Sequence, residues 1–242
     1  MDMLIGGKHI TCDDLEEVKN PFNDEIIDTV PIAHLQHAKM AIKAANNAKK
    51  DLVEMSAFKV SNKLYTICEK LKEKREEFAE LLTLEVGKPI NESLVELNRS
   101  IETLKLAAEE AKRIYGESVP LDAGLNGKGF FAFTQRIPLG VVAAITPFNY
   151  PLNLTIHKIA PAIACKNTVI IKPPTDALSF AATEAYADST CQLRDVITRV
   201  LSDFAMRAFD IFRINTLVFL KTRAELAMRR ISDRFRNILY FE

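Results

Sequence analysis

Three long segments in the first half of the chain carry apolar residues at the three- and four-residue spacing of an amphipathic helix. They cover residues 34–54, 60–84 and 91–115. In the first of them, lysines occupy the opposite face. Gly87 and then Pro89 follow the second segment, in the order that ends a helix. The pattern predicts three amphipathic helices.

Near the N-terminus the spacing changes to the alternation that is typical of strands. Residues 3–10 and 25–30 alternate apolar and polar side chains, and Gly6-Gly7 and Asn23-Asp24 supply turn signals. We expect a small edge sheet here.

The middle of the chain alternates strand and helix patterns. An alternating strand at 130–135 is followed by a wholly apolar strand at 141–145, a helix at 152–164, a second apolar strand at 168–171 and the start of a helix near Leu178. Such alternation favours a parallel sheet with helical crossovers. The predicted fold class is therefore α/β, with a partial Rossmann-like nucleotide-binding domain after the N-terminal helices.

The composition is that of a soluble globular protein, with 242 residues, 48% hydrophobic side chains and a formal net charge of zero. Neutral charge gives no reason to expect nucleic acid or a membrane surface as a partner. The longest uncharged stretch, 137–156, contains three prolines and is not a membrane helix. Because the N-terminus has no apolar run of signal-peptide length, we expect a cytoplasmic location.

The basic residues change type near residue 185. Residues 1–185 contain 18 lysines and 4 arginines, whereas residues 186–242 contain 1 lysine and 9 arginines. We therefore divide the chain into an N-terminal nucleotide-binding portion, 1–185, and an arginine-rich tail, 186–242. Helical spacing of apolar residues predicts a mainly helical tail, with a strand at 214–220 as the alternative.

Two polar side chains follow the two apolar strands. Asn149 lies in a loop that Pro147 and Pro151 stiffen, and Lys172 ends the second strand. Open α/β sheets bind ligands at the carboxyl ends of their strands. An amide donor and a cation at this edge suit oxyanion and nucleotide chemistry.

Several motifs occur in the order of one known family. They are IGGK at 5–8, NPF at 20–22, EVGKP at 85–89, QRIPLG at 135–140, GVVAAI leading into TPFNYP at 140–151, HKIAPA at 157–162 and NTVIIKPP at 167–174. Through them the chain resembles the NAD(P)-dependent aldehyde dehydrogenases, and within that superfamily the archaeal lactaldehyde dehydrogenase type. The resemblance covers about residues 3–185.

The resemblance implies roles for both polar side chains. Asn149 matches the catalytic amide that hydrogen-bonds the oxygen of an aldehyde as that oxygen becomes negative. The alternative is a turn asparagine that satisfies its own loop. Lys172 matches the lysine that binds the adenosine ribose, and the alternative is a solvated strand-end lysine.

Neighbouring residues complete the cofactor site that the resemblance implies. Ile145, Thr146 and Pro147 would line NAD or NADP, and Phe148 would lie beside the nicotinamide or serve as a core aromatic. Family members often carry a glutamate at the position of Thr175, where it binds the same ribose. Without that carboxylate nothing repels a 2′-phosphate, so the choice between NAD and NADP stays open.

Other hallmarks of the family are missing from the sequence. The family's nucleophilic cysteine after a Gly-Gln pair, its general base in a Glu-Leu-Gly-Gly segment and its glycine-rich helix start are not found. We expect this chain alone not to oxidise a small aldehyde such as lactaldehyde. One alternative is a non-catalytic remnant or assembly module, whose helices and strand near Phe130 pair with a full-length subunit while the tail supplies a helical interface. Another is the product of a truncation or frame change. As partners we expect a second copy of the chain, in a homo-oligomer, or a full-length subunit.

The cysteines and histidines indicate neither a redox pair nor a metal site. The four cysteines are widely separated along the chain. We expect Cys165 and Cys191 to be buried packing residues. His34 and His37 lie three residues apart without a third ligand, so we expect surface or capping residues.

Overall fold

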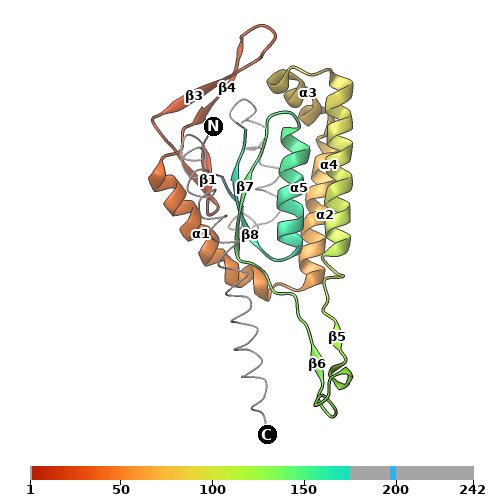
Figure 1. Cartoon of the computed structure of the whole chain (residues 1–242). Helices are drawn as coiled ribbons and strands as arrows, with labels where there is room; N and C mark the ends of the chain where they lie inside the picture. The colour runs from red at the N-terminus through yellow and green to blue at the C-terminus, as the bar shows by residue number, and fades with distance from the viewer. Residues whose placement is uncertain (1, 175–196, 200–242) are drawn as a thin grey trace. The chain divides into compact units, whose positions relative to one another are not determined.

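The computed structural model describes residues 2–174 and 197–199, and only the backbone of the latter (Figure 1). They belong to one compact unit, Met1–Ser202. Thr175, the helix start near Leu178, Cys191 and the alternative strand at 214–220 lie outside the described residues.

The centre of this unit is a parallel sheet with the strand order β7-β8-β9. Its strands are β7 (Val141–Ile145), β8 (Thr168–Lys172) and β9 (Ile197–Arg199). The predicted Rossmann-like sheet is confirmed. The helical prediction for the tail is wrong at 197–199, where hydrogen bonding to β8 decides the local conformation in favour of a strand.

Helices cover both faces of this sheet (Figure 1). On one side Val169 and Ile171 of β8 join a core cluster with α5 (Pro151–Ala164). On the other side Ile170 packs against a smaller cluster that includes residues of α1 (Leu35–Glu54). Alternate residues of β8 therefore face opposite helical layers, as expected for a strand buried on both faces.

Behind α5 lies a second helical layer made of α2 (Ala57–Glu73), α3 (Arg75–Val86) and α4 (Ile90–Glu110) (Figure 1). The sequence predicts one helix across 60–84, but the structure breaks it at Lys74. Apolar residues keep their helical spacing on both sides of Lys74, so the pattern does not reveal the break. The helix at 152–164 and the strands at 141–145 and 168–171 are confirmed.

The N-terminal segment forms two separate hairpins instead of one edge sheet. The first pairs β1 (Met3–Ile5) with β2 (Lys8–Ile10), and the second pairs β3 (Leu15–Lys19) with β4 (Ile26–Pro31). The sequence does not predict β3, because three of its five residues are charged and only Val18 is buried.

A long hairpin extends away from the helices (Figure 1). It pairs β5 (Ser118–Val119) with β6 (Ala132–Phe133) and contains a short 3-10 turn, Leu121–Ala123. Phe131 and Phe133 are 81% and 67% exposed on it. None of the helices in the described ranges is both long and apolar enough to cross a membrane.

Candidate functional site

Two hydrogen bonds fasten the carboxyl ends of β7 and β8 together. The backbone N–H of Thr146 donates to the carbonyl of Lys172 at 3.1 Å, and the Thr146 hydroxyl donates to the same oxygen at 3.2 Å. Thr146 is 5% exposed. The two strands that the sequence assigns to the site therefore end side by side, with their last residues held at one edge.

Ile145 and Lys172 are opposite each other in the parallel register. Paired residues of neighbouring strands point to the same face of a sheet. Ala144 and Ile171, one position earlier, belong to the core beneath α5, so Ile145 and Lys172 point to the other face. Ile145 is 43% exposed there and Lys172 is half-buried. This face presents an apolar side chain next to an ammonium group.

The loop between β7 and α5 carries the remaining predicted residues. Pro147 and Asn149 are exposed, and Phe148 is 39% exposed. Phe148 is therefore not a buried core aromatic. Tyr150 is the N-cap of α5, and Pro151 is its first residue, a position that suits proline because its missing N–H would have no partner.

A buried glutamate that the sequence does not single out orients this loop. Glu96, on α4, accepts hydrogen bonds from the backbone N–H groups of Leu152 and Asn153 at 2.9 and 3.0 Å. Its side chain is fully buried and also forms an ion pair with Lys88. The Lys88 ammonium lies 5.0 Å from the ring centre of Tyr150. The carboxylate satisfies two N–H groups of the first turn of α5 and complements the positive end of the helix dipole.

One signal in the sequence points to Glu96. The position falls within the buried face of α4, with Ser93, Leu97 and Ser100 at helical spacing around it. An acidic residue on an apolar face requires a partner, because an isolated buried carboxylate is strongly unfavourable.

At the opposite end of the strands Asn167 joins β7 to β8. Its side-chain oxygen accepts from the backbone N–H of Gly140 at 2.9 Å, and its amide nitrogen donates to the carbonyl of Ala162 at 3.3 Å. Thr168 continues the connection by donating its N–H to the Gly140 carbonyl at 3.0 Å.

Cys68 and Cys165 differ in burial. Cys68 is buried, and burial raises the pKa of its thiol. Cys165 is exposed, contrary to the sequence prediction. The reason is its position as the C-cap of α5, one residue beyond the buried face that ends at Ala164.

The two histidines act at the start of α1. The backbone N–H of His34, the N-cap, donates to Nδ1 of His37 at 3.0 Å. The predicted capping role is confirmed, but His37 is buried instead of lying on the surface. Within residues 2–174 no three His, Cys, Asp or Glu side chains gather as metal ligands would.

The described residues fit one face of a dinucleotide site. The joined ends of two parallel strands, the ammonium of Lys172 and the half-exposed Ile145 lie where such sheets receive nucleotides. Asn149 supplies an exposed amide in the adjoining loop. The arrangement is suited to binding and to polarising a carbonyl.

Comparisons with known proteins show similarity to one family. The model of the aldehyde dehydrogenase family matches residues 10–196, which extends past residue 185, where the basic residues change type. The lactaldehyde dehydrogenase of Methanococcus aeolicus is 42% identical over 199 residues, which cover 82% of this chain and 39% of that protein.

Solved structures show the same fold. Aldehyde dehydrogenase 21 from Physcomitrella patens, in complex with succinate, superposes with a TM-score of 0.80 at 32% identity over 84% of this chain and 43% of its own. The NADP-dependent glyceraldehyde-3-phosphate dehydrogenase of Bacillus halodurans, in complex with NADP, gives 0.79 at 30% identity over 84% and 44%. The chain thus spans less than half the length of these relatives.

Proposed function

The chain belongs to the aldehyde dehydrogenase family, and on that premise we propose that it forms the part of an NAD(P)-dependent aldehyde dehydrogenase that binds the cofactor and polarises the substrate carbonyl. The observation that carries the proposal is the pair of hydrogen bonds from Thr146 to Lys172, which joins the two strand ends at the ligand-binding edge. A small aldehyde such as lactaldehyde is the proposed substrate, in line with the curated relative that is 42% identical.

The cofactor-binding residues on this proposal are Ile145, Thr146, Pro147 and Lys172, together with Phe148 near the nicotinamide. The Lys172 ammonium hydrogen-bonds the adenosine ribose, and Ile145 supplies apolar contact from the same face of the sheet. Thr175 is proposed to contribute to the same pocket. The dinucleotide, when bound, supplies the hydride acceptor.

Asn149 is the proposed catalytic amide. Its side-chain N–H donates to the carbonyl oxygen of the aldehyde, where negative charge develops when a nucleophile attacks the carbon. A preorganised donor stabilises this charge because it does not have to reorient during the reaction. Pro147 and Pro151 restrict the loop, and Glu96 fixes the start of α5 immediately after it.

The family's cysteine and glutamate motifs are not found in these 242 residues. We therefore propose that this chain by itself binds the dinucleotide but does not oxidise aldehyde, and that turnover requires a nucleophile and a general base from outside it.

The direct test is to titrate the purified chain with NAD and with NADP by calorimetry and to assay it with lactaldehyde by the absorbance of the reduced cofactor. We expect saturable binding, weakened at least severalfold by Lys172→Met and unaffected by Lys50→Met on the exposed face of α1. Absence of binding would contradict the proposed nucleotide site. Aldehyde-dependent turnover would contradict the proposed lack of activity.

The exposed hairpin favours a second candidate, an assembly module. Phe131 and Phe133 are 81% and 67% exposed, and Leu125 at the hairpin tip is fully exposed. Large apolar side chains grouped on one projecting element mark an interaction surface. On this view the chain pairs through β5 and β6 with a second copy or with a full-length subunit. Light scattering should show a dimer or higher oligomer that Phe131→Ser with Phe133→Ser dissociates.

A further inference from the structure

One edge of the central sheet is open in the part of the chain that the structure describes. The strand order β7-β8-β9 places β7 at the end of the sheet, and within the described residues no strand pairs with its outer side. β7 consists of five apolar residues, VVAAI, without a charge, a proline or a shift in register. Natural edge strands usually carry such a device against pairing with another chain. β7 therefore has the character of a strand from the inside of a sheet.

The backbone of β7 presents hydrogen-bonding groups on this open side. Gly140 and Thr146, which flank the strand, both form backbone hydrogen bonds with β8. Backbone groups of successive residues in a strand point alternately to its two sides, so residues 142 and 144 also face β8. The N–H and C=O groups that point to the open side are those of Val141, Ala143 and Ile145. Such a row of groups is a template for a further strand.

One face of β7 is also uncovered. Ala143 is opposite Ile170 of β8 in the register, so both side chains point to the side of α1. Ile170 is half-buried against the cluster that includes residues of α1, whereas Ala143 is exposed. Strands of a parallel sheet normally have helices over both faces. The layer that α1 forms therefore covers β8 and leaves the middle of β7 open.

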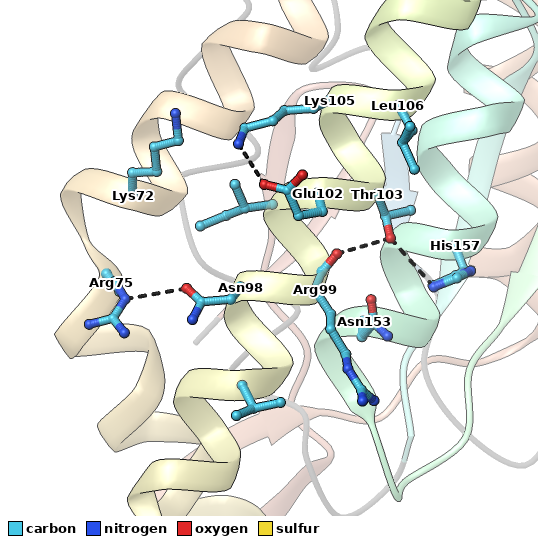
Figure 2. A pocket seen from close by; sticks show the side chains of 12 residues that line it. Lys72, Arg75, Asn98, Arg99, Glu102, Thr103, Lys105, Leu106, Asn153 and His157 are labelled. Carbon is cyan, nitrogen blue, oxygen red and sulfur yellow. Dashed lines mark hydrogen bonds and ion pairs between the residues drawn. The ribbon is translucent and has the colours of Figure 1, made fainter.

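The other face of β7 is covered by two helical layers. Ala144 is 1% exposed and belongs to the core cluster that contains the buried residues of α5. α4 packs behind α5, and Figure 2 shows the Thr103 hydroxyl of α4 beside Nε2 of His157 on α5, at 3.5 Å. The uncovered surface of β7 thus lies on its outer edge and on its α1 side.

We propose that the outer edge of β7 docks a parallel strand from a polypeptide that carries the rest of the aldehyde dehydrogenase fold, with the helix after that strand lying over Ala143. The strand bonds to the outward backbone groups of β7, and the helix covers the exposed face. The proposal deepens the proposed function and rests on it, because the same polypeptide brings the nucleophile and the general base.

Two observations favour this partner over a second copy of the chain. A two-fold dimer through this edge would pair β7 with β7 in antiparallel orientation, whereas the strands described in this sheet are all parallel. The region shared with this chain is 39% of the Methanococcus aeolicus protein and 43% of aldehyde dehydrogenase 21. More than half of each relative therefore remains to provide such a strand and helix.

The test co-expresses the full chain, carrying an affinity tag, with the part of the Methanococcus aeolicus lactaldehyde dehydrogenase that follows its matched region. We expect the two polypeptides to purify together as a complex with one copy of each, as measured by light scattering. Absence of this complex would overturn the proposal. A dimer of the chain alone that Ala143→Pro dissociates would also overturn it, because the occupant of the edge would then be a second copy.

Two variants locate the docking edge. Ala143→Pro removes an N–H from the open side and leaves the bonds to β8 in place, so the chain should keep its melting temperature. Ala143→Lys puts a charge on the exposed face, which the free chain tolerates. Each should reduce the amount of co-purified partner at least tenfold. Ala123→Lys, the same exchange at an exposed alanine of the hairpin, should change it less than twofold. Retention of the partner in both Ala143 variants, or an equal loss in Ala123→Lys, would overturn the proposal.

Titration of the chain alone with NADP separates this inference from the proposed function. NADP binding without formation of the complex would overturn the docking edge alone. A complex that depends on Ala143, without NADP binding by the chain, would support the docking edge and contradict the proposed cofactor site.

Discussion

The carboxylate of Glu96 accepts a hydrogen bond from the backbone N–H of Leu152 at 2.9 Å, across 56 residues of sequence. This contact ties α4 to the first turn of α5, immediately after the loop that carries Asn149. The same carboxylate forms an ion pair with Lys88. The segment before α4, α4 itself and the start of α5 therefore meet at this buried side chain. Glu96 therefore fixes the start of α5, next to the loop that carries the proposed catalytic amide.

The first prediction concerns this carboxylate. Glu96→Gln keeps the shape of the side chain but leaves the buried Lys88 without a counter-charge, and breaking such a pair costs about 3–5 kcal/mol. We expect a loss of this size in the free energy of unfolding, measured by urea titration. Glu92→Gln, on the exposed face of the same helix, should change it by less than about 0.5 kcal/mol. Similar losses of unfolding free energy in the two variants would show that the buried ion pair stabilises the fold no more than an exposed glutamate does.

The second prediction concerns the hydroxyl that joins the strand ends. Thr146→Val keeps the side-chain volume but removes the hydroxyl that donates to the Lys172 carbonyl. That carbonyl still accepts the hydrogen bond from the backbone N–H of residue 146. We expect a loss of about 0.5–1.5 kcal/mol in stability, together with weaker NADP binding. Thr66→Val removes a comparable hydroxyl bond on an exposed helix surface and should leave NADP affinity unchanged. Unaltered NADP affinity in Thr146→Val would contradict a role for the joined strand ends in the cofactor site.

The sequence predicts the segments whose burial repeats regularly. Strand 168–171 and helix 152–164 are confirmed because their apolar runs lie in a strand buried on both faces and in a helix against it. The pattern fails where burial is sparse or where helical spacing continues across a break. Only Val18 of β3 is buried, and the break at Lys74 interrupts the helix without changing the apolar spacing.

The candidate site shows the same limit at the level of single residues. Asn149 and Lys172 are predictable because strand ends and proline-rich loops have recognisable patterns. The apolar spacing around Glu96 indicates that its carboxylate needs a partner, but it does not identify that partner, since the backbone N–H groups of a distant helix carry no signal in the sequence. Cys165 is exposed because it is the C-cap of α5, one residue beyond the buried face that ends at Ala164.

The third prediction tests the connection at the other end of the strands. Asn167→Ala removes the acceptor for the buried N–H of Gly140, and an unsatisfied buried donor costs about 1–3 kcal/mol. Urea unfolding should show a loss in this range. Asn46→Ala deletes a side-chain bond to the Ile42 carbonyl on exposed helix surface, and its effect should stay below about 0.5 kcal/mol. A loss in Asn167→Ala no larger than that of Asn46→Ala would refute the importance of this connection.

The fourth prediction is a dependence of stability on pH. Burial, with a smaller contribution from His34, lowers the pKa of His37 below its ordinary value. The unfolded chain therefore takes up this proton more readily than the folded one. The stability that the neutral ring contributes is fully present above about pH 6.5 and declines as the pH falls below that value. Protonation also removes the Nδ1 lone pair that accepts from the His34 N–H.

Melting temperatures at pH 7.5 and pH 5.5 check this expectation. His37→Gln should lose less stability between the two pH values than the unaltered chain, whereas His9→Gln, an exposed histidine on β2, should behave like the unaltered chain. Equal pH sensitivity of the chain and of His37→Gln would disprove the role of His37.

The fifth prediction compares two glycines that adopt positive φ. Gly87, the C-cap of α3, has a φ of 73°, and a Cβ there would lie 2.7 Å from the Pro21 Cγ. Gly129 has a φ of 92° with no atom within 4 Å of the same position. Alanine at either site meets the unfavourable left-handed backbone, which costs about 1–2 kcal/mol. Only at Gly87 must the neighbouring hairpin also move, because a separation below 3 Å is a steric overlap.

We therefore expect Gly87→Ala to lower the free energy of unfolding by at least about 1 kcal/mol more than Gly129→Ala does, as overpacking in a close contact typically does. Adding Pro21→Ala to Gly87→Ala removes the Cγ that the new Cβ meets and should restore part of the loss. Equal losses in the two single variants, with no recovery in the double variant, would mean that the backbone conformation alone accounts for the glycine. Recovery would instead show that Gly87 is required for the close approach of the β3–β4 turn to the end of α3, immediately before the Lys88 that pairs with Glu96.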